Sequence, residues 1–138
     1  MCGIAGYWNI NGADGGEFAR DLKQAITSLN HRGPDDSRLW CNERGVGLGQ
    51  ARLAILDLSE HRLQPMLSDD GRYAMVFNGE VYNVNEPHKE LEDKGSCFHS
   101  SGDSEVVLAA FQTWGAECGH RFIGMFAYLM VPKMDDVN

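Results

Sequence analysis

The sequence predicts one α/β domain in which helices cover at least one face of a sheet. The chain has 138 residues, about the length of one ordinary domain. Hydrophobic residues make up 43% of the chain and charged residues 23%, a balance that can build a core. Strand-like apolar stretches alternate with segments of helical periodicity, which is typical of layered folds. The predicted order is strand, helix, strands, hairpin, helix, helix and strand.

The first half of the chain predicts a buried strand, a helix and further strands. Residues 2–8 form a short apolar run that ends at the turn-prone residues 9–12. Residues 46–58 are rich in Val, Leu and Ile, which predicts a strand or a pair of strands packed on both faces. Between them, a helix that ends before Gly33-Pro34 is indicated by one apolar stripe, made by Phe18, Leu22, Ala25, Ile26 and Leu29.

The second half predicts a hairpin, two helices and a last strand. Residues 74–77 and 80–83 are both β-prone, and Asn78-Gly79 between them is a strong signal for a hairpin turn. The remaining elements are a helix over residues 86–94, a helix over residues 105–114 that stops at Gly115, and a core strand over residues 122–131.

Charge and cysteine spacing exclude several classes of function. The chain has 20 acidic residues against 12 Lys and Arg, a formal charge of −8, which repels phosphate backbones and anionic lipid. We therefore expect neither a nucleic-acid nor a membrane partner. No apolar run approaches the roughly 18 residues that cross a bilayer, and no export signal is present, so we expect a cytoplasmic protein. The four cysteines lack metal-ligand spacing, so we expect no metal site and no disulfide.

Cys2 is the first candidate for chemistry because it directly follows the initiator Met1. A cysteine attacks an acyl carbon as the thiolate, and a free thiol with a reference pKa of about 8.5 is mostly protonated at neutral pH. If Met1 is removed, the freed α-amine, with a reference pKa of about 7.7 to 8.0, can accept the thiol proton. The alternative is a small cysteine buried at the start of a strand.

Four other residues suit an acyl-transfer site for a free amino acid. The Asn78 amide and the Gly79 N–H can stabilise an oxyanion, or the pair can be a plain hairpin turn. Arg52 lies in an apolar strand, where it can clamp a substrate carboxylate or pair with a protein carboxylate. Asp103 can accept an ammonium group or cap the helix that begins near it. Together with Cys2, these residues form a recognition set for the amide of an α-amino acid.

Seven ordered blocks of the sequence resemble the class II glutamine amidotransferase domain of glutamine-hydrolysing asparagine synthetases. The resemblance runs from residue 1 to about residue 128. The blocks are MCGIAG (1–6), HRGPDD (31–36), ARLAILDLS (51–59), QPM (64–66), FNGEVYN (77–83), GDSE (102–105) and GMFA (124–127).

The resemblance implies an α+β fold of the N-terminal-nucleophile hydrolase type, with two stacked, mainly antiparallel sheets between helices in an αββα arrangement. The family continues into more strands after the last block, so we expect residues 1–138 to form a glutaminase domain that is incomplete at its C-terminus. The synthetase domain would need a pyrophosphate loop, and residues 100–104 lack its second glycine. We therefore expect no synthetase domain and no ATP site in this chain.

The resemblance also assigns roles to site residues. It implies that Cys2 is the nucleophile and that its freed α-amine is the base, with the oxyanion held by Asn78 and Gly79. It places Arg52 on the α-carboxylate of glutamine and Asp103 on the α-ammonium. The same resemblance implies that Glu80 lines the pocket, and that His31 and Arg32 shape a loop rather than react.

The implied reaction forms a γ-glutamyl thioester, releases ammonia and yields glutamate. This half-reaction needs no metal or cofactor, whereas ATP and Mg would serve only the synthetase domain. The implied partners are glutamine and an ammonia-accepting synthetase domain or subunit, and the existence of a homodimer stays open. Two alternatives remain: an inactive fragment that binds a partner, and an N-terminal-nucleophile hydrolase of another amide.

Overall fold

The computed structural model describes residues 2–12, 16–53 and 63–132. Within these residues the chain forms two three-stranded sheets and three α-helices. The elements are β1 (Gly3–Trp8), α1 (Glu17–Ser28), β2 (Asp36–Cys41), β3 (Val46–Arg52), β4 (Met66–Leu67), β5 (Tyr73–Val81), α2 (Asn85–Asp93), α3 (Asp103–Trp114), the 3₁₀ helix η2 (Gly115–Arg121) and β6 (Gly124–Pro132).

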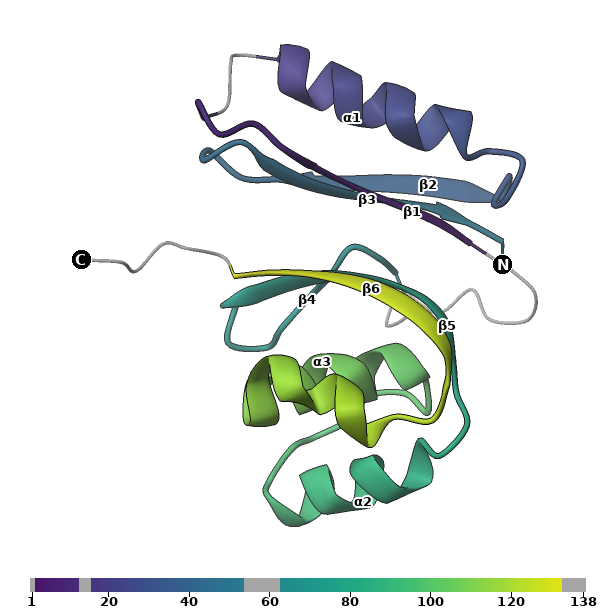
Figure 1. The fold of residues 1–138 in the computed structure, drawn as a ribbon, viewed down its shortest axis with the longest axis vertical. Helices are drawn as coiled ribbons and strands as arrows, with labels where there is room; N and C mark the ends of the chain where they lie inside the picture. The colour runs from purple at the N-terminus through teal and green to yellow at the C-terminus, as the bar shows by residue number, and fades with distance from the viewer. Residues whose placement is uncertain (1, 13–15, 54–62, 133–138) are drawn as a thin grey trace.

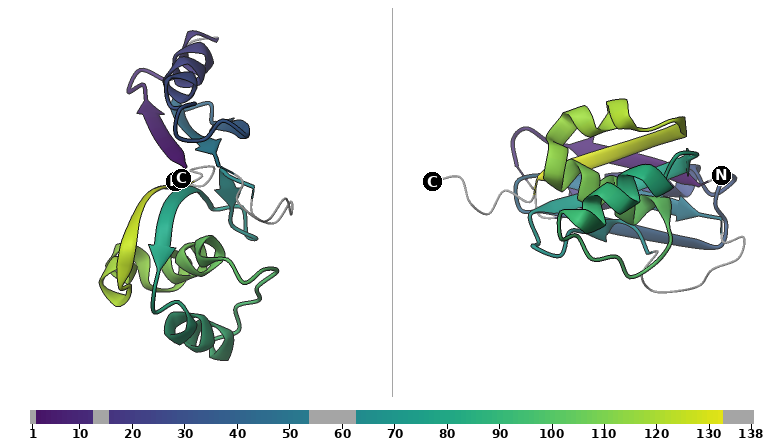
Figure 2. Two further views of the ribbon diagram at one scale, coloured as in Figure 1. Left: turned by 90° about the vertical axis from the view of Figure 1, so that its right-hand side faces the viewer. Right: turned by 90° about the horizontal axis from the view of Figure 1, so that it is seen from below.

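The two sheets are stacked between helices (Figure 1). The first sheet has the strand order β1-β3-β2 and the second β4-β5-β6, and every pair is antiparallel. Helix α1 covers the outer face of the first sheet, whereas α3, with α2 beyond it, covers the outer face of the second (Figures 1 and 2). The α/β class predicted from the alternation of segments is wrong, because no strand pair in the described residues is parallel. The domain is α+β, and the four-layer arrangement implied by the resemblance is confirmed.

Helix α1 packs closely on the first sheet because its apolar stripe meets a strand rich in glycine. Phe18, Leu22 and Ile26 are buried, as the periodicity predicts. Gly49 of β3 lies under this helix, and a Cβ at that position would overlap the Ile26 side chain. Because side chains alternate along a strand, Leu48 on the opposite face of β3 lies toward the second sheet.

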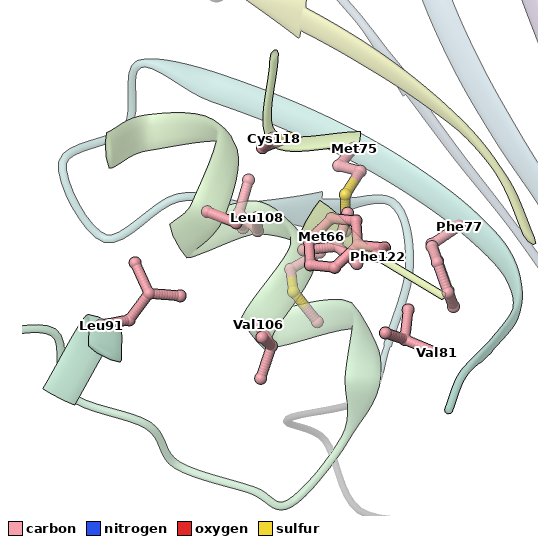
Figure 3. Close-up of a cluster of buried hydrophobic side chains, with 11 residues drawn as sticks. Met66, Met75, Phe77, Val81, Leu91, Val106, Leu108, Cys118 and Phe122 are labelled. Carbon is pink, nitrogen blue, oxygen red and sulfur yellow. The ribbon is translucent and has the colours of Figure 1, made fainter. Parts of the chain in front are cut away.

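Two apolar clusters hold the layers together. The larger one lies between the second sheet and helices α2 and α3 (Figure 3) and includes Met75, Phe77, Leu91 and Val106. The smaller one lies between the sheets, and its members are Leu48, Ala74 and Val76 with Ile4, Trp40 and Val131 against them. Because side chains alternate along a strand, each strand contributes one face to the inter-sheet layer and one to a helix.

The predicted hairpin at Asn78-Gly79 is wrong. Both residues lie inside β5, a single strand that pairs with β6 along its whole length from Tyr73 to Val81. A two-residue type I′ turn needs a positive φ at both central residues, and among the described residues only glycines have one. Pairing with a strand more than 40 residues away in the sequence therefore overrides the local turn signal.

The other predicted elements are confirmed to within a few residues where the structure describes them. Three elements were not predicted, namely β2, β4 and η2. The strand predicted over residues 46–58 ends at Arg52, and residues 54–62 lie outside the described residues. Among the helices that the structure describes, none is long and apolar enough to cross a membrane.

Candidate active site

A cavity of about 500 Å³ brings together the six residues to which the sequence analysis assigned a role in catalysis or substrate binding. It lies where β1 begins and β3 ends, and it extends to the last part of β5 and the first residues of α3. The predicted residues that line it are Cys2, Arg52, Asn78, Gly79, Glu80 and Asp103. A smaller cavity of about 260 Å³, between residues 65–69 and α3, contains none of them.

Cys2 and Arg52 reach the cavity from neighbouring strands of the first sheet. Gly3 pairs with Ala51, so the same register continued by one residue sets Cys2 opposite Arg52. Ile4 and Leu48 face the inter-sheet layer, and alternation therefore turns Cys2 and Arg52 toward the same side. The Leu53 N–H donates to the Cys2 sulfur at 3.5 Å, and an N–H donor suits the charge that a thiolate carries.

Asn78 and Glu80 reach the cavity from the second sheet. Ala74 and Val76 face the inter-sheet layer, so the next residues of the same parity, Asn78 and Glu80, share that face of β5. The two sheets thus contribute opposite walls of one site. The nucleophile candidate comes from the first sheet and the amide donor from the second.

The backbone of β5 turns the Gly79 N–H away from β6. The Tyr82 N–H donates to the Ile123 carbonyl of the segment that leads into β6. Because hydrogen bonding alternates along an antiparallel pair, the N–H and C=O groups of even-numbered β5 residues face β6. Those of odd-numbered residues face the opposite edge of β5. On that other edge, the Phe77 N–H donates to Gln64 and the Val81 N–H to Asp103. The Gly79 N–H lies between them, at the cavity wall.

Only glycine fits at position 79. Its φ is 141°, a conformation that side chains strongly disfavour. A Cβ there would also overlap the Met125 carbonyl oxygen of the paired strand β6. The site therefore needs glycine for a close approach of two strands, and not for the turn that the sequence suggested.

Asp103 joins helix α3 to the end of β5. It is the first residue of α3, and its Oδ2 accepts the Val81 N–H at 2.7 Å. The N-cap position belongs to Gly102, and no side chain caps this helix, so the capping alternative for Asp103 is wrong. A carboxylate at a helix N-terminus is also favoured by the helix dipole.

The loop that follows α1 packs against the end of β3. The Asp35 N–H donates to the Arg52 carbonyl at 3.0 Å, so this loop supports the strand end that carries Arg52. His31 is exposed, and its Nδ1 lies 3.0 Å from the Ser28 carbonyl oxygen. Neither His31 nor Arg32 lines the cavity, and their role in shaping the loop stays a prediction.

Sequence reasoning missed several residues of the cavity wall. Gln50 and Gln64 are both buried there, although glutamine is usually exposed. Gln50 follows Leu48 and precedes Arg52 on one face of an apolar strand, and the reasoning that singled out Arg52 would have found it. Leu53, Tyr82 and Met125 also line the cavity, and although each lies in one of the ordered blocks, no chemical property singled it out.

Cys41 and Cys118 lie outside the cavity. Loss of hydration, partial at Cys41 and fuller at the buried Cys118, raises the pKa of both thiols, so both stay protonated at neutral pH. All four cysteines are free. In the described part of the chain, no group of three or more His, Cys, Asp and Glu side chains could hold a metal ion.

A family model and several curated proteins match nearly the whole chain. A family model described as "Glutamine amidotransferase domain" matches residues 1–136. The chain is 39% identical over 141 residues to asparagine synthetase [glutamine-hydrolyzing] 1 of Bacillus subtilis, a match that covers 99% of this chain and 22% of that protein. It is 35% identical over 130 residues to asparagine synthetase [glutamine-hydrolyzing] 3 of the same organism, with 93% and 21% covered. The chain thus spans about a fifth of the length of these relatives.

A solved structure shares the fold. The glutamine phosphoribosylpyrophosphate amidotransferase of Bacillus subtilis superimposes with a TM-score of 0.75 over 96% of this chain and 35% of that one. The two sequences are 18% identical, so this match speaks for the architecture alone.

Proposed function

Because this chain belongs to the glutamine amidotransferase domain family, we propose that its 500 Å³ cavity hydrolyses glutamine to glutamate and ammonia. The family and the stacked-sheet architecture make it a class II domain with the N-terminal-nucleophile hydrolase fold. One observation carries the proposal: five residues chosen for amide chemistry, which come from four separate segments, line the same cavity.

In the proposed reaction, the Cys2 thiolate attacks the carboxamide carbon of glutamine. After removal of Met1, the α-amine of Cys2 takes the thiol proton and later delivers it to the leaving nitrogen. The Asn78 amide and the Gly79 N–H stabilise the oxyanion of the tetrahedral intermediate. When the C–N bond breaks, ammonia leaves and a γ-glutamyl thioester remains. Water then attacks the thioester carbon, the C–S bond breaks, and glutamate and the thiol are released.

Charged residues on both sides of the cavity suit the two ends of a free amino acid. Arg52 would clamp the α-carboxylate with two parallel hydrogen bonds. Asp103 would accept the α-ammonium while Glu80 lines the same wall. The two charges lie on different elements, which supports recognition of glutamine as a free amino acid rather than of any amide.

We further propose that the released ammonia goes to an ATP-dependent synthetase domain or subunit. The relatives named as asparagine synthetases are about five times as long as the matched segment, which leaves room for a second activity. ATP and Mg would act there, and the residues of this cavity need no cofactor for the thioester route. The names of these relatives favour an aspartate-type acceptor over another substrate.

Ammonia release from glutamine tests the proposal directly. We expect Cys2→Ala to reduce ammonia release to background, while Cys41→Ala and Cys97→Ala, at exposed sites outside the cavity, keep it. Asn78→Ala removes one oxyanion donor and should lower kcat by about 10²- to 10³-fold, on the order of 3 kcal/mol.

Intact-mass measurement provides the second arm of the test. A glutamine-analogue affinity label should add one equivalent of mass to the wild-type protein and none to Cys2→Ala, and the unlabelled mass should show that Met1 is absent. A Cys2→Ala variant as active as the wild type would overturn the proposal, and so would an active protein that retains Met1. Comparable turnover of asparagine or simple acyl amides would assign the cavity to another amide.

A further inference from the structure

The backbone of Phe77, next to the oxyanion residues, is held between two glutamine side chains. Gln64 Oε1 accepts the Phe77 N–H at 2.5 Å, and Gln50 Nε2 donates to the Phe77 carbonyl at 3.1 Å. The backbone partners determine both directions, because an amide N–H only donates and a carbonyl only accepts. Gln50 is 5% exposed and Gln64 is 8% exposed, so both bonds are made away from solvent.

These two side chains take the place of a neighbouring strand. β4 pairs with only Ala74 and Met75 of β5, so it ends before Phe77 is reached. The N–H and C=O of Phe77 point away from β6 and would otherwise be unsatisfied in a buried place, which is costly. The glutamines therefore fix the edge of β5 at the position where its regular pairing on that side stops.

The same edge carries the proposed oxyanion donor. Gln64 holds the amide of Phe77 and Asp103 holds the amide of Val81, so the Gly79 N–H is bracketed by two anchored amides of the same strand edge. Asn78 lies between Phe77 and Gly79 on the chain. A shift of the Phe77 backbone would therefore move both proposed oxyanion donors together.

We propose that Gln50 and Gln64 are positioning residues that act through the Phe77 backbone to hold Asn78 and Gly79 in place for the tetrahedral intermediate. The inference rests on the proposed glutaminase function. Oxyanion donors act only in correct geometry, and a displacement of about 1 Å can cost about 100-fold in rate. A brace of this kind affects the transition state far more than substrate binding, so its loss lowers kcat and leaves KM nearly unchanged.

A pair of Gln→Glu substitutions tests the direction of each hydrogen bond. In Gln64→Glu the carboxylate still accepts the Phe77 N–H, whereas in Gln50→Glu it replaces a donor with an acceptor that faces a carbonyl. Both new carboxylates would lie in one small hollow that is also lined by Asp36, Arg38 and Arg52, so the two variants add the same charge to the same surroundings. Gln64→Met removes the acceptor at similar side-chain volume.

We expect Gln50→Glu and Gln64→Met to lower kcat by about 10- to 100-fold with KM for glutamine within about threefold of wild type. Gln64→Glu should recover most of the kcat that Gln64→Met loses. Calorimetric titration with glutamate counts the folded sites of each variant, and kcat is expressed per site, so partial unfolding does not imitate the effect. Gln24 lies on the exposed face of α1 and outside the cavity, so Gln24→Glu controls for the Gln-to-Glu change itself and should leave kcat at the wild-type value.

The outcomes separate the two proposals. A wild-type protein that releases no ammonia from glutamine overturns the proposed function and the positioning role with it. An active wild type with equal kcat losses in Gln50→Glu and Gln64→Glu overturns the positioning role alone. A kcat per site that stays at the wild-type value in Gln50→Glu also overturns the positioning role. So does a rise in KM with unchanged kcat, because the glutamines would then contact the substrate directly.

Discussion

Asp103 has two tasks at once, and they use different properties of its carboxylate. One oxygen accepts the Val81 N–H at 2.7 Å and ties α3 to β5, a task that any side-chain oxygen could perform. Binding the α-ammonium of glutamine needs the negative charge itself. The two tasks can therefore be separated by substitution.

Asp103→Asn keeps an oxygen for Val81 and removes the charge. We expect it to raise KM for glutamine and lower kcat/KM by about 10- to 100-fold, because a hydrogen bond to a charged group contributes about 1.5 to 3 kcal/mol. Steady-state kinetics measure this effect. Glutaramate, which is glutamine without its amino group, supplies the control, since its turnover by wild type and variant should be similar. Equal losses for both substrates would contradict the ammonium role.

At the scale of elements, local signals predicted helices and buried strands but failed where pairing is non-local. The stripe on α1 and the ends of α2 and α3 could be predicted from periodicity and from glycines, because helices form from contacts within one segment. The Asn78-Gly79 signal failed because β6 pairs across it. β2 was missed because an edge strand such as Asp36–Cys41 is largely exposed and carries charge.

The turn between β4 and β5 depends on one carboxylate. Asp70 accepts hydrogen bonds from the Ser68 hydroxyl at 2.6 Å, from the Arg72 N–H at 3.0 Å and from Arg72 Nε at 2.6 Å. The bond from Ser68, followed by those from Arg72, holds the pKa of Asp70 well below its ordinary value of 3.8. The folded protein therefore binds the proton of this group less readily than the unfolded chain does. Its contribution to stability is present above about pH 4 and is lost as the pH falls below it.

We expect Asp70→Asn to lower the thermal unfolding midpoint by a few degrees at pH 7. The difference in unfolding midpoint from wild type should shrink as the pH falls from 4 to 3. In this range the unfolded wild-type chain binds a proton at Asp70 more readily than the folded protein does. Thermal denaturation followed by circular dichroism at pH 7, 5 and 3 measures it. Asp69→Asn, at the exposed neighbouring position, provides the matched control. A difference that does not change with pH would contradict the assignment.

At the scale of the whole molecule, the site exists only because the two sheets are stacked. The first sheet carries Cys2 and Arg52, and the second carries Asn78 and Gly79. Between them lies the small inter-sheet cluster that includes Leu48. Packing in this layer therefore sets the distance between the proposed nucleophile and the oxyanion donors.

Two leucine substitutions distinguish this layer from the outer core. Leu48 is 1% exposed and lies between the two sheets. Leu91 of α2 is 0% exposed and belongs to the cluster between the second sheet and its helices. We expect Leu48→Ala and Leu91→Ala each to lower the free energy of unfolding by about 2 to 5 kcal/mol in urea denaturation. Only Leu48→Ala should also reduce kcat for ammonia release per folded site. Equal kcat in the two variants would show that inter-sheet packing does not tune the site.

The sequence by itself determined the residues of the proposed site and most of the elements that carry them. Arg52 stood out as a charge in an apolar strand and Cys2 as a thiol next to Met1, whereas Asn78 and Asp103 suited a hairpin turn and a helix cap equally well. The ordered blocks then implied the family, and the comparisons confirm it. These signals are local, since each depends on a residue and a few neighbours along the chain.

Only the tertiary structure decided how these residues meet. It made Asn78-Gly79 part of a strand, it bound Asp103 to Val81 rather than to its own helix, and it buried two glutamines against Phe77. Each of these depends on contacts between segments far apart in the sequence. A buried backbone group needs a side-chain partner only where its strand edge has no neighbouring strand. That edge exists only after the sheets have formed, so the sequence alone does not identify the partner.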